Sequence, residues 1–211
     1  MYFQDRAEAG QLLAKELEWL RGLESLLVLG IPRGGVVVAY EVAKELDAPL
    51  DVYITRKIGA PHNPELAIGA VASDGTVVLD QALIRRLSVS DGYVQQETAR
   101  QRREIDRRLA AYRGAQAELN LTAKTVVLVD DGVATGATVL ASLRAIRERQ
   151  PARLILAVPV GPPDTIHQLS QEVEQVVCLH TPEMFWAVGA FYAVFDQTSD
   201  TEVVRLLKEN R

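Results

Sequence analysis

The sequence predicts an α/β fold, with a mostly parallel, doubly wound sheet flanked by helices and one inserted hairpin and long helix. Short runs of purely apolar residues, at Leu26–Leu29, Val126–Val129 and Leu154–Val158, are typical of strands buried on both faces. Helical patterns follow these runs, as expected of strand–helix–strand units in a parallel sheet. An Asp-Gly turn followed by an arginine-rich helical stretch breaks this alternation, and it predicts an insertion over about residues 58–118.

Length and composition are those of one globular domain. The chain has 211 residues, 48% apolar and 24% charged, so a single domain over residues 1–211 is expected. The net charge of −5 argues against nucleic-acid binding by the whole surface. The single cysteine, Cys178, excludes an intrachain disulfide and fits a reducing compartment. Without a membrane-length apolar run or a signal-peptide pattern, we expect a cytoplasmic protein with no membrane partner.

The first part of the chain predicts a helix and then a parallel unit. Asp5 and Glu8 form a capping-box pattern, and apolar residues follow it at helical spacing. After the first apolar strand, the segment Pro32–Gly35 breaks the pattern. A helix is then expected over Val36–Leu46 and a second core strand over Leu50–Thr55.

The insertion has a different pattern. Two β-rich runs within Ala67–Leu79 flank an Asp-Gly turn and predict a hairpin. Ser90 is expected to cap a long helix that reaches Arg113 and ends at Gly114. Residues 85–113 contain eight arginines and four acids. The apolar stripe of this helix is narrow, which suits a helix lying over a surface; it consists of Val94, Ile105, Leu109 and Tyr112.

The parallel pattern returns in the second half of the chain. Its expected elements are a strand at Thr125–Val129, a helix at about Thr138–Arg149, a strand at Leu154–Val158, a helix opened by Pro162-Pro163, a strand at Val176–Leu179, and a helix capped by Ser199 that runs through Lys208.

The segment Val126–Thr138 carries the strongest chemical signal. Two carboxylates, Asp130 and Asp131, follow a buried strand, and a loop with two glycines and two threonines leads into a helix. Amides at a helix N-terminus favour an anion such as phosphate, whereas carboxylates accept hydrogen bonds from sugar hydroxyls. A sugar phosphate satisfies both halves. The alternative is a simple strand–turn–helix in which Asp131 only caps the helix.

This segment resembles the phosphoribosyl pyrophosphate signature of type I phosphoribosyltransferases, and the resemblance covers it completely. It implies that Asp130 and Asp131 hold the ribose hydroxyls and bind Mg²⁺, mainly through water or substrate. It also implies that Ala134, Thr135, Gly136, Ala137 and Thr138 cradle the ribose phosphate. Gly132 and Val133 complete the predicted substrate-binding loop.

Two further basic segments fit the same family. Arg33, with Gly34 and Gly35, follows the first core strand, where the family places its pyrophosphate loop. Arg56 and Lys57 follow the second core strand and resemble the Arg-Lys pair with which adenine-type members reach pyrophosphate. The resemblance implies that Arg33 and Lys57 act beside the two acids in catalysis, and that Arg56 and the two glycines bind substrate. The alternatives are a strand-to-helix turn and a solvated basic pair.

The acceptor side is less defined. Ala134 stands where hypoxanthine- and guanine-type members carry an aspartate, which argues against that subclass. His62 is a candidate acid–base group, with a solvated loop histidine as the alternative. Candidates for stacking on a base, with core packing as the alternative, are Phe185, Trp186, Phe191 and Tyr192.

The resemblance implies transfer of a phosphoribosyl group from phosphoribosyl pyrophosphate to a nitrogenous base, with Mg²⁺ as cofactor and pyrophosphate as product. The alternative is a non-catalytic regulator that senses phosphoribosyl pyrophosphate or a nucleotide on the same fold. The inserted helix is expected to act as a flap over pyrophosphate or as the contact of a homodimer. Its arginines alternate with acids, which argues against nucleic acid as a partner.

Overall fold

A five-stranded parallel sheet forms the centre of the computed structural model, which describes residues 1–113 and 119–210. Its strand order, β2-β1-β6-β7-β8, places β6 in the middle, between β1 and β7. The sheet contains β1 (Leu26–Gly30), β2 (Leu50–Val52), β6 (Thr125–Val129), β7 (Arg153–Val160) and β8 (Gln175–His180).

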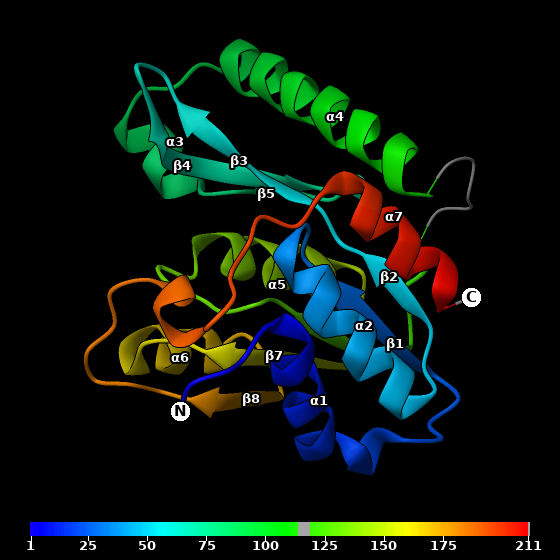
Figure 1. Ribbon diagram of the computed structural model, residues 1–211. Coiled ribbons are helices and arrows are strands. Elements are labelled where there is room, and N and C mark those ends of the chain that lie inside the picture. Colours follow the sequence, from blue (N-terminus) through cyan, green and yellow to red (C-terminus); the bar gives the residue numbers. More distant parts are fainter. Residues whose placement is uncertain (114–118, 211) are drawn as a thin grey trace.

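Helices cover both faces of this sheet, because alternate strand residues point to opposite sides (Figure 1). Val127 and Val129 pack with α1 (Arg6–Glu16) and α2 (Gly34–Leu46). Val126 and Leu128 pack on the other face, with α5 (Ala137–Glu148) and α6 (Pro163–Ser170). The doubly wound arrangement predicted from the apolar runs is confirmed. Two short 3₁₀ turns, η1 (Glu18–Leu20) and η2 (Val188–Phe191), complete this part.

A second, antiparallel sheet lies above the first (Figure 1). Its strands, in the order β3-β4-β5, are β3 (Thr55–Ala60), β4 (Asn63–Ala72) and β5 (Val77–Leu79). A short helix α3 (Gln81–Arg86) follows, and the long helix α4 (Asp91–Arg113) crosses the outer face of the sheet. We call residues Thr55–Arg113 the cap. The hairpin expected around the Asp-Gly turn is present, as β4 and β5.

One end of the cap is fastened to the rest of the molecule. Tyr112 donates a hydrogen bond of 2.7 Å to the Asp200 carboxylate on α7 (Asp200–Glu209). Arg113 donates from Nε to Asp51 at 2.7 Å, and its side chain is only 7% exposed. These contacts fix the C-terminal end of α4 against β2 and α7.

The boundary between the two sheets differs from the prediction. A single strand was expected over Leu50–Thr55, but β2 ends at Val52 and Thr55 begins β3 in the other sheet. Tyr53 and Ile54, the residues between them, are 0% and 3% exposed, so the apolar pattern runs on through the turn. Periodicity alone therefore could not separate the two strands.

The helix boundaries are close to those predicted. Ser90 accepts a hydrogen bond from the Tyr93 amide, as expected of the α4 cap. Helix α2 begins at Gly34, two residues before the predicted start, and the short α3 was not predicted. Gly114, the expected end of the long helix, lies outside the described residues, as does the end of the predicted insertion. In the described part of the chain, no helix is both long and apolar enough to cross a membrane.

The narrow apolar stripe of α4 predicts how much one of its residues contributes to the stability of the fold. Ile105 is 1% exposed and packs into the cluster that joins α4 to the second sheet. Ile105→Ala should lower the free energy of unfolding by about 2–5 kcal/mol, because it leaves a cavity. The exposed Leu87, at 41%, provides the control, and Leu87→Ala should change stability by less than about 0.5 kcal/mol. Equal effects of the two substitutions in urea unfolding would contradict the packing described for α4.

Candidate functional site

The two predicted acids lie at the carboxyl end of β6, the middle strand of the main sheet. The start of α2 packs directly against them. A Cβ atom on Gly35 would lie 2.7 Å from Asp130 Oδ1, and one on Gly34 would overlap Asp131 Oδ2. Glycine is therefore required at both positions for this approach. The structure thus brings together the two segments that the sequence predicted as the ribose and pyrophosphate sites.

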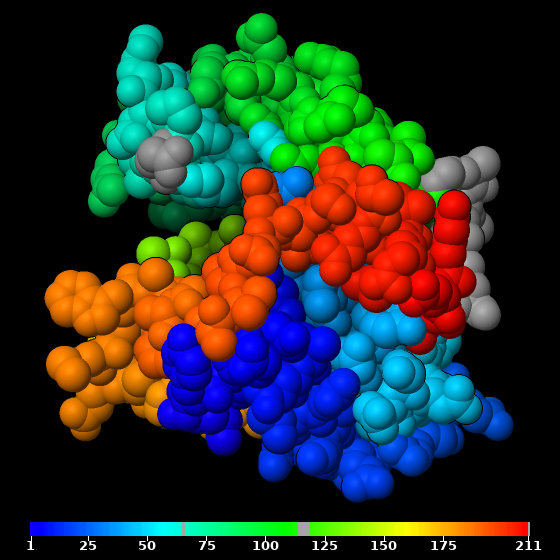
Figure 2. Space-filling model, in the orientation of Figure 1, coloured from blue at the N-terminus to red at the C-terminus, as the bar shows by residue number. Residues whose placement is uncertain are grey.

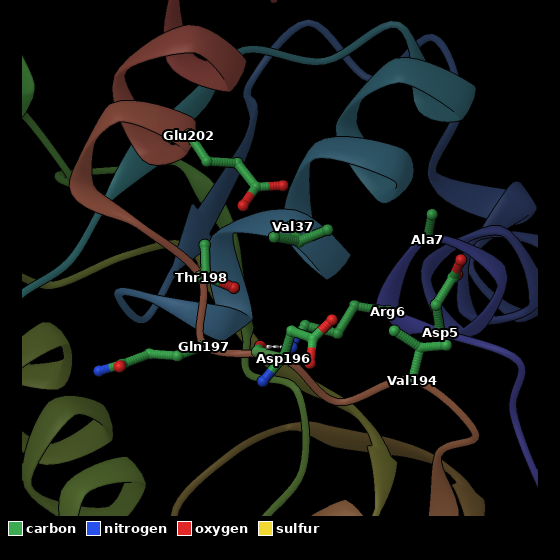
Figure 3. A pocket seen from close by; sticks show the side chains of 9 residues that line it. All are labelled: Asp5, Arg6, Ala7, Val37, Val194, Asp196, Gln197, Thr198 and Glu202. Atoms are coloured by element: carbon green, nitrogen blue, oxygen red, sulfur yellow. Dashed lines mark hydrogen bonds between the residues drawn. The ribbon is translucent and has the colours of Figure 1, made fainter.

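Arg6, which the sequence analysis did not identify, is bound to this acid pair. Its Nε donates to Asp131 Oδ2 at 2.7 Å, and the two side chains are only 12% and 16% exposed. Its terminal nitrogen donates to the Asp196 carbonyl at 2.8 Å, beside which Arg6 lies in Figure 3. The guanidinium carbon also lies 3.9 Å above the centre of the Phe195 ring. No local pattern links residues 6 and 131, so periodicity and motif could not reveal the contact.

Burial and mutual repulsion govern the ionisation of the acid pair. Burial raises the pKa of Asp130 well above its usual range, and the neighbouring charge of Asp131 raises it further. Burial also raises the pKa of Asp131, while the hydrogen bond and charge of Arg6 oppose that rise. Two carboxylates share one guanidinium, so ionisation of both leaves a surplus negative charge. Such a site attracts hydroxyl donors or a cation.

The loop after the acid pair forms a hollow at the start of α5. Residues 132–139, together with Asp130 and Val188, line a cavity of about 240 Å³. Gly136 has a φ of 72° and lies just before the helix, where no side chain caps the first amides. Amides in the first turn of a helix have no partner within the helix, so they favour an anion.

Val133 is placed differently from the rest of this loop. Its side chain is 2% exposed and its amide donates to the Val160 carbonyl at 2.9 Å. The Val133 amide therefore already has a partner within the protein, and its side chain belongs to the core.

A second cavity, of about 420 Å³, separates the cap from α5. Its lining includes Arg56, Lys57 and Tyr93 from the cap, and Thr138 from the start of α5. Figure 2 shows the molecule hollowed between the cap and the part below it. Thr138, at the start of α5, and the predicted pair Arg56 and Lys57 therefore line one cleft. Thr138 belongs to the main part of the fold, and the basic pair belongs to the cap.

The basic residues are held in ways that the sequence did not indicate. Arg56 and Lys57 lie within β3 rather than after a strand of the main sheet. Consecutive strand residues point to opposite faces, and Arg56 Nε donates to Gln101 Oε1 on α4 at 2.6 Å. Arg33, at the start of α2, lies 4.0 Å from the Asp200 carboxylate and keeps 35% of its side chain exposed.

The acceptor-side candidates do not form one group. His62 is exposed in the turn between β3 and β4, with a φ of 64°. Tyr192 is 3% exposed and its hydroxyl donates to the Asp131 carbonyl at 2.6 Å, so it supports the acid pair from the core. Phe185 and Phe191 stack on each other, with centroids 5.4 Å apart. Trp186 is 89% exposed.

The acid pair also fits a loosely held Mg²⁺ ion. Within the described residues, no group of three or more histidine, cysteine or acidic side chains could hold a metal by itself. Mg²⁺ commonly keeps several waters and takes one or two carboxylates together with substrate phosphates. Asp130 and Asp131 would supply that limited set of ligands.

Comparison with known proteins gives a consistent result. The model of the phosphoribosyl transferase domain matches residues 5–196. The crystal structure of TT1426 from Thermus thermophilus is 45% identical in sequence, covers 99% of both chains and superposes with a TM-score of 0.88. Two proteins of Mycobacterium tuberculosis, named as presumed phosphoribosyl transferases, are each 44% identical over 205 residues. The match covers 97% of this chain and 46% of theirs, so the chain spans about half the length of these curated relatives.

The raised pKa of Asp130 predicts a pH-dependent stability. The folded protein favours the protonated acid, so this group makes the wild type less stable as the pH rises above about 4, the unfolded value. Asp130→Asn should remove that loss, and the variant should be more stable than the wild type at about pH 7.5 and gain less at about pH 4.5. Urea unfolding at both values measures the difference. Asp106→Asn, on the exposed part of α4, is the control. A gain that is equal at both pH values would contradict the assigned burial.

Proposed function

Since this chain belongs to the phosphoribosyl transferase domain family, we propose that it transfers a phosphoribosyl group from phosphoribosyl pyrophosphate to a nitrogenous base. The observation that carries the proposal is the contact between the acid pair and the glycines that begin α2. It places acceptors for sugar hydroxyls directly beside amides suited to a phosphate. This one arrangement supports binding and positioning of both the ribose and the phosphates of phosphoribosyl pyrophosphate.

The ribose would lie over the acid pair. Asp130 and Asp131 accept hydrogen bonds from its two hydroxyls, while the hollow at the start of α5 receives the phosphate. Thr135 and Thr138 are exposed at that hollow, where their hydroxyls can donate to phosphate oxygens. Arg6 donates to the Asp131 carboxylate, and Tyr192 donates to the Asp131 backbone carbonyl. These two contacts fix the direction of the carboxylate oxygen that remains for the ribose. A preorganised acceptor of this kind reduces the cost of ordering the ribose.

The pyrophosphate would lie between α2 and the cap. Amides at Gly34 and Gly35 face it from below, and Lys57 faces it from the cleft wall. In the transfer, the bond from the anomeric carbon to a pyrophosphate oxygen breaks and a bond to the base nitrogen forms. Pyrophosphate leaves with the electron pair of the broken bond, and the proton of the base nitrogen is released to water. The protein contributes by opposing the charge that develops on the leaving group, through Lys57 and Arg33.

When bound, Mg²⁺ would supply positive charge that offsets the negative charge of the pyrophosphate. Asp130 and Asp131 would hold it mainly through water or through the substrate. Arg6 donates to Asp131 Oδ2, and the Asp131 amide donates to Asp130 Oδ1, so the other oxygen of each carboxylate would make these contacts.

The proposed binding site predicts the effect of removing both acids. Asp130→Asn with Asp131→Asn should weaken Mg²⁺-dependent binding of phosphoribosyl pyrophosphate at least about tenfold, because hydrogen bonds to charged groups contribute about 1.5–3 kcal/mol each. Calorimetry with and without Mg²⁺ measures this. The matched control, Asp47→Asn with Asp106→Asn, makes the same change in net charge at exposed positions. Unchanged affinity in the first variant, or equal losses in both, would remove the acids from the site.

The missing aspartate at position 134 predicts the acceptor preference. Ala134 is exposed and offers no carboxylate to a purine ring. With hypoxanthine or guanine, kcat/KM should therefore be about a hundredfold lower than with the best base of a panel, the typical contribution of one acid–base group. Production of nucleoside monophosphate from each base measures it. Efficient formation of inosine or guanosine monophosphate would contradict this assignment. Tight binding of the donor without turnover of any base would favour the sensor over the enzyme.

A further inference from the structure

A separate cavity on the cap is lined mainly by arginine. It has a volume of about 370 Å³, and we call it the basic cavity. Its lining consists of Arg56, Arg100, Arg103 and Arg107 with Gln101 and Glu104. Four guanidinium groups thus face one carboxylate in a chain whose net charge is −5. Concentrated positive charge on an acidic protein indicates a specific anionic ligand rather than general attraction to polyanions.

The basic cavity adjoins the cleft of the proposed transfer site. Arg56, Arg100 and Gln101 line both cavities, whereas Arg103 and Arg107 line only the outer one. The inner cleft alone includes residues of the proposed transfer site such as Lys57. A ligand in the basic cavity would therefore be next to the transfer site without occupying the acid pair.

The guanidinium groups are held in place but retain unused donors. Glu104 accepts from Arg107 Nε at 2.9 Å and from a terminal nitrogen at 2.8 Å, so one edge of that guanidinium is fixed. Arg100 has one long contact, 3.4 Å, to Glu97. For Arg103, the described part of the chain provides no hydrogen bond or ion pair. Each guanidinium carries five N–H donors, so most of those facing the cavity are available to a ligand.

The partial burial of the Arg56 charge supports the same conclusion. Burial lowers the pKa of Arg56, and the charges of Arg108 and Arg100 lower it further, against the opposing effect of Glu104 and Glu97. An anion in the cavity would favour the charged form of Arg56, which burial disfavours.

We propose that the basic cavity binds an oligophosphate chain, as a second anion site beside the transfer site. Arg100, Arg103 and Arg107 lie along one side of α4 and span about 10 Å of its axis, at 1.5 Å per residue. A single phosphate is too short to contact all three, whereas a chain of several phosphates can follow them. Arginine also binds phosphate through two parallel hydrogen bonds, which gives the site geometric selectivity. The chain can come from inorganic oligophosphate or from a nucleoside triphosphate.

Calorimetry with inorganic tripolyphosphate tests the site. The variant Arg103→Ala with Arg107→Ala should lose at least about tenfold in affinity, because two charge-assisted contacts disappear. The matched control is Arg102→Ala with Arg205→Ala, which removes the same charge outside the cavity: Arg102 is bonded to the Gly75 carbonyl and Arg205 to Glu209. We expect less than about a twofold change there. Circular dichroism of both variants checks folding.

Two further measurements separate this site from the transfer site and identify the source of the phosphate chain. Tripolyphosphate should still bind when Asp130→Asn and Asp131→Asn are present, so failure of the transfer proposal would not affect this measurement. A nucleoside triphosphate that binds much more tightly than tripolyphosphate, with the same sensitivity to the outer arginines, would identify a nucleotide as the source. Absence of tripolyphosphate binding would overturn the proposal. So would binding that the control variant weakens as much as the Arg103–Arg107 variant does, or binding that keeps its full affinity without both outer arginines while pyrophosphate saturates the transfer site.

Discussion

The burial of Asp130 and Asp131 is the constraint on which the rest of the site depends. Moving a charge away from water costs several kcal/mol unless it is paired and hydrogen-bonded. The Arg6 guanidinium pairs with Asp131, and Gly34 and Gly35 give the acids a close backbone neighbour in place of a side chain. Asp130 has no such ion pair, and burial therefore raises its pKa. A hydroxyl donor or a cation at this strand end would offset the cost of ionising it.

The acid pair is supported by two segments that are far apart in the sequence. Arg6 belongs to a helix that precedes the sheet, and Tyr192 belongs to a segment that follows it. The two segments are joined by backbone hydrogen bonds of Phe3, which donates to Phe191 and accepts from Ala193. Together they form a wall behind Asp131 that the central sheet alone could not supply.

The parts that could be predicted from sequence are those that local patterns encode. Apolar runs and caps gave the strands and helices, and the signature after β6 gave the acid pair together with its loop. Arg6 could not be found, because its contact joins residues 125 apart and leaves no periodic trace. The end of β2 was misplaced because Tyr53 and Ile54 stay buried between the two sheets. The roles given to the site residues remain predictions, since shape and charge suit several reactions on one fold.

The way the cap is attached limits how it could close on a ligand. Its polar contacts with the core gather near the start of β3 and the end of α4. Thr55 is bonded there to Ser142 at 2.9 Å, and Arg113 to Asp51. Any hinge motion of the cap would therefore pivot at this end. Lys57 lies two residues from Thr55 and would move little, whereas Arg100 lies 13 residues, or about 20 Å along the helix, from Arg113 and would move most. Closure would thus leave Arg56 and Lys57 nearly in place and change mainly the positions of the α4 arginines that line the basic cavity. A ligand bound there would bias the cap toward whichever position fits it better, and only to the extent of that difference in affinity.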